Sequence, residues 1–260
     1  MVFYILSELF LRLCDLISED QRYSLGEQGQ DMRLTILPTL VGGAITLLAA
    51  LLSFWLANRA ERSKREEEAQ RLSAAEAMSG LFKLVQWTNL LHNIKRHIDE
   101  FYKQAAEEGH QPAEPALTIG PSAGIFVEPS LLEAREYTFL AQTRSSNLIA
   151  KLKLLEERSI NSHHLIKLYS KYHLELQAWM EEIPDFHVEL DGPIATNLFP
   201  PAYRSSYEIR LAQLNRIIGG LVEHLDEDIQ NAEDLVKEFA NIAHEHFGSQ
   251  FPRFSLERNE

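Results

Sequence analysis

One uncharged stretch of the chain constrains its fold more than any other feature. Residues 34–58 read LTILPTLVGGAITLLAALLSFWLAN and lie between Arg33 and Arg59. A helix rises about 1.5 Å per residue, so this stretch is about 37 Å long, enough to cross a hydrocarbon core about 30 Å thick. Pro38 falls in a first turn, and Trp55 lies near the far end, where interfacial aromatic residues occur. The stretch therefore predicts a single transmembrane helix.

The same stretch has two other interpretations. A core helix of a soluble protein can be equally apolar, but this length without charge is typical of spanning helices. A secretory signal peptide has a shorter apolar region behind a basic segment, and neither property fits the stretch. Both interpretations explain the length of the stretch and its lack of charge less well than a membrane anchor does.

Basic residues beside the stretch predict its orientation. The fifteen residues after Asn58 contain five Lys or Arg, and the fifteen before Leu34 contain two. Because basic flanks stay in the cytoplasm, we expect the N-terminus outside a plasma (inner) membrane and the C-terminal region in the cytoplasm. We also expect contacts with anionic headgroups from the basic residues nearest the anchor: Arg59, Arg62, Lys64 and Arg65.

Small residues form a ridge on the predicted anchor. Gly42, Thr46 and Ala50 recur every four residues. Small residues at this spacing let two helices approach closely in lipid, although they are also common in spanning helices that do not associate. The ridge predicts self-association of the anchor, and ordinary membrane-helix composition is the alternative.

The residues before the anchor form a separate predicted region, 1–33. Apolar residues recur at steps of three and four over 2–17, which predicts an amphipathic helix. It can lie flat on the outer membrane face or pack on a partner protein, and the pattern does not separate these two. The polar residues 18–33 predict a linker to the anchor at 34–58.

The C-terminal two hundred residues predict an all-α domain. Apolar residues alternate at steps of three and four from Leu84 to Ala105 and again from Leu211 to His246, as in packed helices. A third helical pattern covers 129–183, and the poor helix formers at 159–162 can kink it. Gly248 is a plausible C-cap of the last helix.

These helices predict the organisation of the cytoplasmic part. We expect a charged helical neck over 59–76, then an antiparallel, three-helix, coiled-coil-like bundle over 77–250, and a tail over 251–260. The connections at 109–128 and 184–205 are rich in Pro and Gly. Strand signals are nearly absent, and we expect irregular connections. A small hairpin in which 117–119 pairs with 125–127 is the less favoured alternative.

Composition and motifs argue against several classes of function. The chain has 25 Lys and Arg against 38 Asp and Glu, which gives a net charge of −13. A negatively charged protein repels the phosphate backbone, so we expect no nucleic acid as a partner. Cys14 is the single cysteine, so neither an internal disulfide nor a cysteine metal cluster is expected. Glu107 and His110 have the one Glu-x-x-His spacing in the chain, whereas a di-iron bundle requires two such pairs on facing helices. We expect no metal and no cofactor, although ligands assembled from separate helices stay open.

A serine-hydrolase motif is present in letters only. Residues 120–124 read GPSAG and match G-x-S-x-G, but this motif needs a strand before the serine and a helix directly after it. Here it lies in a Pro- and Gly-rich connection of a helical chain. We therefore expect a turn-rich loop and no catalytic residue.

Asp228 interrupts the apolar seam of the last helix, between Leu225 and Ala232. A lone carboxylate on a packed face is costly unless it is paired. Asp228 is therefore either a polar seam residue that fixes the helix register, or it is solvated because the helix turns Ile229 inward.

The sequence predicts a non-catalytic, membrane-anchored interaction protein that is a scaffold, an adaptor or a signalling component. Long amphipathic helices present faces to partner proteins, so we expect self-association or an unknown membrane or cytoplasmic partner. The alternative is a sensor or effector subunit of a membrane defence or transport complex. A third hypothesis is a membrane-tethered hydrolase with its site in the 109–128 and 184–205 connections, a length that is often functional.

The orientation can be tested with topology reporters. A reporter fused after Glu260 should be active only in the cytoplasm, and one fused at the N-terminus only outside, because of the five-to-two basic bias. The opposite pattern of activity would show that the C-terminal domain lies outside.

Overall fold

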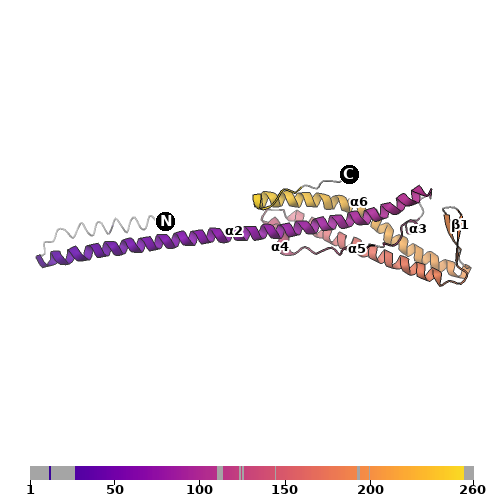
Figure 1. Cartoon of the computed structure of the whole chain (residues 1–260), viewed down its shortest axis with the longest axis horizontal. Coiled ribbons are helices and arrows are strands. Elements are labelled where there is room, and N and C mark those ends of the chain that lie inside the picture. The colour runs from indigo at the N-terminus through magenta and orange to yellow at the C-terminus, as the bar shows by residue number, and fades with distance from the viewer. Residues whose placement is uncertain are drawn as a thin grey trace. The chain divides into compact units, whose positions relative to one another are not determined.

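The computed structural model describes Arg12 and residues 27–109, 114–122, 124, 126–143, 145–191, 194–198 and 200–254. Nearly all of these residues are helical (Figure 1), so the all-α prediction is confirmed for the described part of the chain. The amphipathic helix predicted over 2–17 lies outside the described residues, apart from Arg12, which is helical. The chain has two compact units, Met1–Glu66 and Glu67–Glu260, and each is described by itself.

Helix α2 spans Glu27–Glu107 without a break, as expected for an anchor helix that continues into the next helix. It begins earlier than the predicted anchor, so residues 27–33 are helical and the polar linker is shorter than expected.

Within the first unit, α2 is long and apolar enough to cross a membrane, judged by length and composition. A core helix of a soluble protein would pass the same test, but its apolar side chains would be covered. Here Leu47 is 64% exposed and Phe54 is 70% exposed. The exposure of these side chains is consistent with a helix that lipid surrounds.

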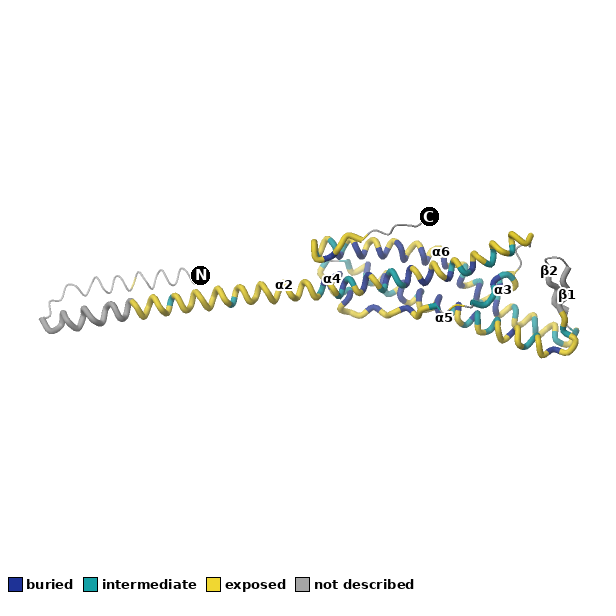
Figure 2. The backbone as a smooth tube through the Cα atoms, in the orientation of Figure 1, coloured by how far each residue is buried: buried dark blue, intermediate teal, exposed yellow. Residues whose placement is uncertain are grey.

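The second unit has one hydrophobic core to which α2, α4, α5 and α6 contribute (Figure 2). Helix α4 spans Ala134–Gln142, α5 spans Ser146–Glu181 and α6 spans Pro201–Phe247. Helix α3, Pro115–Thr118, also packs on α6, and the 3-10 turn η2, Gly248–Gln250, follows α6. The largest fully buried side chains include Trp87 and Tyr169.

Ion pairs between the helices of the second unit define their directions. Lys95 of α2 pairs with Asp226 of α6 at 3.3 Å, and His92 Nε2 lies 3.1 Å from Glu233 Oε1. Lys151 of α5 likewise pairs with Glu238 of α6 at 3.1 Å, whereas the later Arg158 pairs with the earlier Asp228. Residue numbers rise on one helix as they fall on the other, so α6 runs antiparallel to both α2 and α5.

The helix predicted over 129–183 is two helices, α4 and α5, and this corrects the prediction. Residues 126–133 are not helical, and α4 begins with a capping box between Glu133 and Glu136. The expected kink at 159–162 does not break α5. Ser159 and Ser162 are both buried, so these poor helix formers lie in the packed interface, where tertiary packing outweighs propensity.

The alternative hairpin in the first connection does not form, because residues 115–118 form helix α3. Pro115 lies in its first turn, where proline is favourable. A hairpin occurs in the other connection, where β1, His187–Asp191, pairs antiparallel with β2, Ile194–Leu198. Asp191, the last residue of β1, pairs with Ile194, and it is followed by Gly in the sequence; Asp-Gly is a turn signal.

The end of α6 agrees with its predicted cap. Gly248 has φ 59°, a conformation that glycine adopts readily, and its N–H donates to the His244 carbonyl. The predicted C-cap at Gly248 is therefore confirmed.

A matched pair of leucines on α2 tests the core of the second unit. Leu91 is fully buried, whereas Leu72 is 63% exposed. In a fragment covering 67–260, Leu91→Ala should lower the free energy of unfolding by about 2–5 kcal/mol because it leaves a cavity. Leu72→Ala should change it by less than about 0.5 kcal/mol. Denaturant titration followed by circular dichroism measures both, and equal effects would refute this assignment of the buried face.

Candidate binding groove

The predicted anchor ridge is an open surface within the first unit. Gly42, Thr46 and Ala50 are all exposed, and a Cβ added at Gly42 would meet no atom within 4 Å. The Thr46 hydroxyl donates to the Gly42 carbonyl at 2.8 Å. The hydroxyl is thus bound inside its own helix. A second helix would therefore meet small side chains and apolar surface on the ridge.

The predicted headgroup residues follow the apolar segment along α2. The Arg59 guanidinium lies over the Trp55 ring, 5.4 Å from its centroid, which is a cation–π contact at the end of the apolar segment. Arg65 pairs with Glu61 at 2.5 Å, one helical turn away. Arg62 and Lys64 are exposed. All four residues are therefore accessible to a membrane surface.

The structure places Asp228 in the core, paired with Arg158 of α5. The Asp228 side chain is 7% exposed, and the Arg158 guanidinium donates to its carboxylate. This hydrogen bond raises the pKa of Arg158 above its ordinary value. Ile229 is buried beside Asp228. The helix therefore buries both residues, and the alternative of a solvated Asp228 is wrong.

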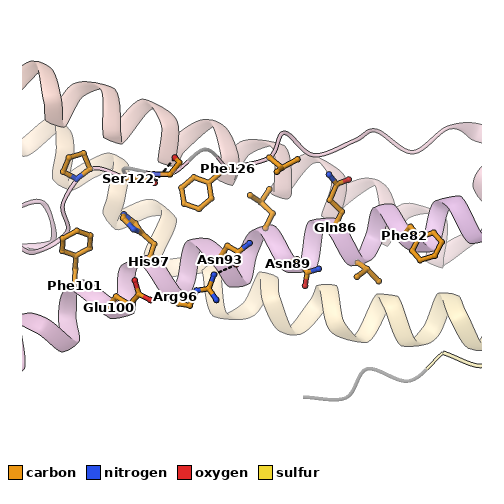
Figure 3. A pocket seen from close by; sticks show the side chains of 15 residues that line it. Phe82, Gln86, Asn89, Asn93, Arg96, His97, Glu100, Phe101, Ser122 and Phe126 are labelled. Atoms are coloured by element: carbon orange, nitrogen blue, oxygen red, sulfur yellow. Dashed lines mark hydrogen bonds between the residues drawn. The ribbon is translucent and has the colours of Figure 1, made fainter. Parts of the chain in front are cut away.

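A groove of about 870 Å³ lies between α2 and the connection that follows α3 (Figure 3). One continuous face of α2 lines it, because the lining residues of this helix recur every three to four residues. Five residues of the connection form the other wall. From α2 these are Phe82, Val85, Gln86, Asn89, Leu90, Asn93, Arg96, His97, Glu100 and Phe101; from the connection they are Pro121, Ser122, Gly124, Phe126 and Val127.

Side chains of α5 hold the connection in place. Ser170 Oγ accepts a hydrogen bond from the Ser122 N–H at 3.0 Å, and His163 Nε2 lies 3.1 Å from the Phe126 carbonyl oxygen. The Tyr169 hydroxyl donates to the Ile119 carbonyl. Burial raises the pKa of Tyr169 well above its ordinary value, which keeps this donor protonated. The connection is thus a fixed wall of the groove.

A buried carboxylate fixes the chain beyond the groove. Glu136 of α4 accepts hydrogen bonds from Ser79 Oγ at 2.7 Å, from Lys83 Nζ at 2.9 Å and from the Glu133 N–H at 2.8 Å. Burial acts to raise the pKa of Glu136, but these hydrogen bonds outweigh it and the pKa is lowered. Lys83 Nζ also donates to the Leu131 carbonyl at 2.8 Å, which ties the chain before α4 to α2.

His97 lies at one end of the groove, between two aromatic rings. Its ring meets Phe101 and Phe126 edge-on, at centroid distances of 5.1 and 6.2 Å. Figure 3 shows His97 pointing from α2 toward the connection. Its Nε2 atom is buried and has no hydrogen-bond partner in the part of the chain that the structure describes. An unpaired buried nitrogen costs about 1–3 kcal/mol, so His97 is a costly element of this end of the groove.

Amide side chains line the middle of the groove. The Asn93 carbonyl oxygen accepts a hydrogen bond from Arg96 at 2.8 Å. Gln86 and Asn89 have no hydrogen-bond partner among the described residues. Arg96 and Glu100 are the lining residues that carry formal charge at neutral pH, and their charges are opposite. The groove therefore offers hydrogen bonds and apolar contact without a strong net charge.

The groove geometry suits binding. Ser122 of the predicted turn-rich loop lies in the wall, and its hydroxyl is 3.3 Å from both the nitrogen and the carbonyl oxygen of Gly124. Within the described residues, no cluster of three or more His, Cys, Asp or Glu could hold a metal ion.

The sequence interpretation missed this groove. The signal was present on α2, where Phe82, Gln86, Asn89 and Asn93 repeat at helical spacing beside the buried seam. A polar stripe of this kind is typical of any solvated face, so the stripe by itself predicts nothing. The second wall comes from a connection about thirty residues away, which only the fold brings there.

No protein-family model matches the chain, and neither a curated protein nor a solved structure matches it.

The Arg158–Asp228 pair gives an asymmetric prediction. Arg158→Met leaves Asp228 buried without its cation, and should lower the free energy of unfolding by about 3 kcal/mol, the low end for broken buried pairs. Asp228→Leu should cost less, because the Arg158 side chain is 36% exposed and can be hydrated. Denaturant titration of fragment 67–260 measures both, and the reverse order would show that Arg158, not Asp228, is the desolvated partner.

Proposed function

We propose that the protein is a non-catalytic, membrane-anchored interaction protein. Its second unit would be a cytoplasmic, antiparallel, coiled-coil-like three-helix bundle that binds a partner protein in the groove on α2. The plasma (inner) membrane placement, with the N-terminus outside, rests on the basic residues that follow the anchor. The observation that carries the proposal is the groove itself, with its accessible amides and the buried, unpaired His97 nitrogen.

Apolar side chains at the groove support a protein partner. Phe82 is 62% exposed and Val127 is 65% exposed, and they line the groove from its two walls. Large aromatic residues beside polar groups are typical of the energetic centres of protein interfaces. The net charge of −13 disfavours nucleic acid as the partner.

Two other roles are compatible with the same features. Self-association is one, because the Gly42, Thr46 and Ala50 ridge would bring two copies together in the membrane. A sensor or effector subunit of a larger membrane complex would also need a groove partner. The mass and identity of whatever occupies the groove decide among these.

Photo-crosslinking in native membranes tests the proposal. A photoreactive amino acid at Asn89, in the groove, should give a defined adduct on illumination. The same amino acid at Leu154, which is 51% exposed on α5 and outside the groove, should not. The adduct should weaken when Phe82→Ser is added, because a specific partner uses the groove wall.

The adduct mass separates the possible partners. A mass twice that of the chain identifies a second copy, and any other mass identifies a different protein. Equal adducts at Asn89 and Leu154, or none at Asn89 at equal expression, would contradict the groove as a partner site.

A further inference from the structure

The groove is elongated along the axis of α2. Phe82 and Phe101 lie at opposite ends of the labelled face of α2 in Figure 3. They are nineteen residues apart on one helix, so the groove runs for about 28 Å at about 1.5 Å per residue. An extended polypeptide covers about 3.3 Å per residue, so about eight residues would fill this length. A compact small molecule would occupy only a fraction of it.

The amides of the groove select among elongated ligands. An Asn or Gln side chain offers both a donor and an acceptor, which is what each peptide group of an extended chain also offers. A bound helix has satisfied its own backbone groups internally, so it would leave these amides without backbone partners. An acyl chain would bury the amides without any hydrogen bond, which is costly.

The spacing of the amides fits an extended chain. Asn89 and Asn93 are one helical turn apart, a rise of about 6 Å. Peptide groups that face the same side of an extended chain repeat every two residues, about 6.6 Å. Asn89 and Asn93 can therefore meet successive peptide groups of one edge of a bound strand, with Gln86 continuing the row.

The ends and the charge of the groove define the ligand further. Phe82 and Val85 form an apolar end, and Phe101 and Pro121 form the other. The charges of Arg96 and Glu100 balance, so no run of charge on the ligand is favoured. Single-stranded nucleic acid has aromatic contacts in common with this groove, but it needs a basic track along its phosphates.

We propose that the groove binds an extended segment of a partner protein, about eight residues long, with little net charge and an apolar side chain at each end. The Asn89, Asn93 and Gln86 amides bind its backbone, and Phe82 and Phe101 contact the apolar side chains at its two ends. This inference rests on the proposed function, because it names the class of partner that the groove accepts.

A peptide library tests this inference on the full chain. The purified protein in lipid nanodiscs is used to select from a phage-displayed library of random nonapeptides, and selected peptides are titrated by fluorescence anisotropy. The Asn89→Ala, Asn93→Ala double variant should weaken binding about tenfold, the loss expected for two hydrogen bonds. Asn161→Ala, at an exposed asparagine of α5, is the matched control and should not change the affinity.

Backbone recognition is tested on the peptide itself. N-methylation at alternate central peptide bonds should abolish binding, because it removes backbone N–H donors. Substitution of the central side chains by Ala should be tolerated. Substitution of the apolar side chain at either end by Ala should weaken binding. Circular dichroism of the variants checks that they are folded. The affinity of Gln86→Ala, at a half-buried position of the groove, is measured in the same way and should also fall.

Several outcomes would overturn the inference. These are a library without any selected binder, binders that the double variant binds as tightly as the original chain does, and binders that tolerate N-methylation or become helical. If Asn89 photo-adducts form but the library fails, the protein binds a partner that is not an extended segment. If the adducts fail as well, the proposed function fails with it.

Discussion

The fold of the second unit depends on side chains that bind the backbone between α3 and α4. This segment is not helical, so it cannot satisfy its own N–H and C=O groups, and buried backbone groups must find partners. Glu156 accepts from the Leu132 N–H at 2.6 Å, and Trp87 Nε1 donates to the Ser130 carbonyl at 2.9 Å. Without these hydrogen bonds the segment would leave α2, and the groove would lose the wall that makes it a site.

Buried charge is used in the same way in this unit. Glu156 is 7% exposed, and Lys153 Nζ lies 2.7 Å from its second oxygen, so a cation compensates a carboxylate that also binds the backbone. Glu136 and Lys83 repeat this arrangement on α4 and α2. Such pairs contribute little net stability, because desolvation offsets their attraction. Their value is geometric, since each pair fixes one point of an irregular chain against a helix.

The sequence predicted what depends on local periodicity and missed what depends on distant contacts. The α2 seam, including Leu91, and the Gly248 cap follow from spacing and from the conformations that glycine allows, so both were predictable. The continuity of α5 through Ser159 and Ser162 was not, because these residues resemble helix breakers until their burial is known. The groove could not be predicted either, since Asn89 and Phe126 are distant in sequence and only tertiary hydrogen bonds bring their segments together.

The open face of α2 differs from an ordinary solvated helix face in a way that follows from the fixed wall. A free helix surface exposes its amides to water, which satisfies them at no cost. Beside the connection, the same face includes His97, whose Nε2 is buried between Phe101 and Phe126 and unpaired in the described chain. The connection thus converts part of a solvated face into a desolvated one. Half-buried aromatic rings beside the exposed Asn89 and Asn93 amides favour a ligand that brings both apolar surface and hydrogen-bonding groups, and a polypeptide segment has both.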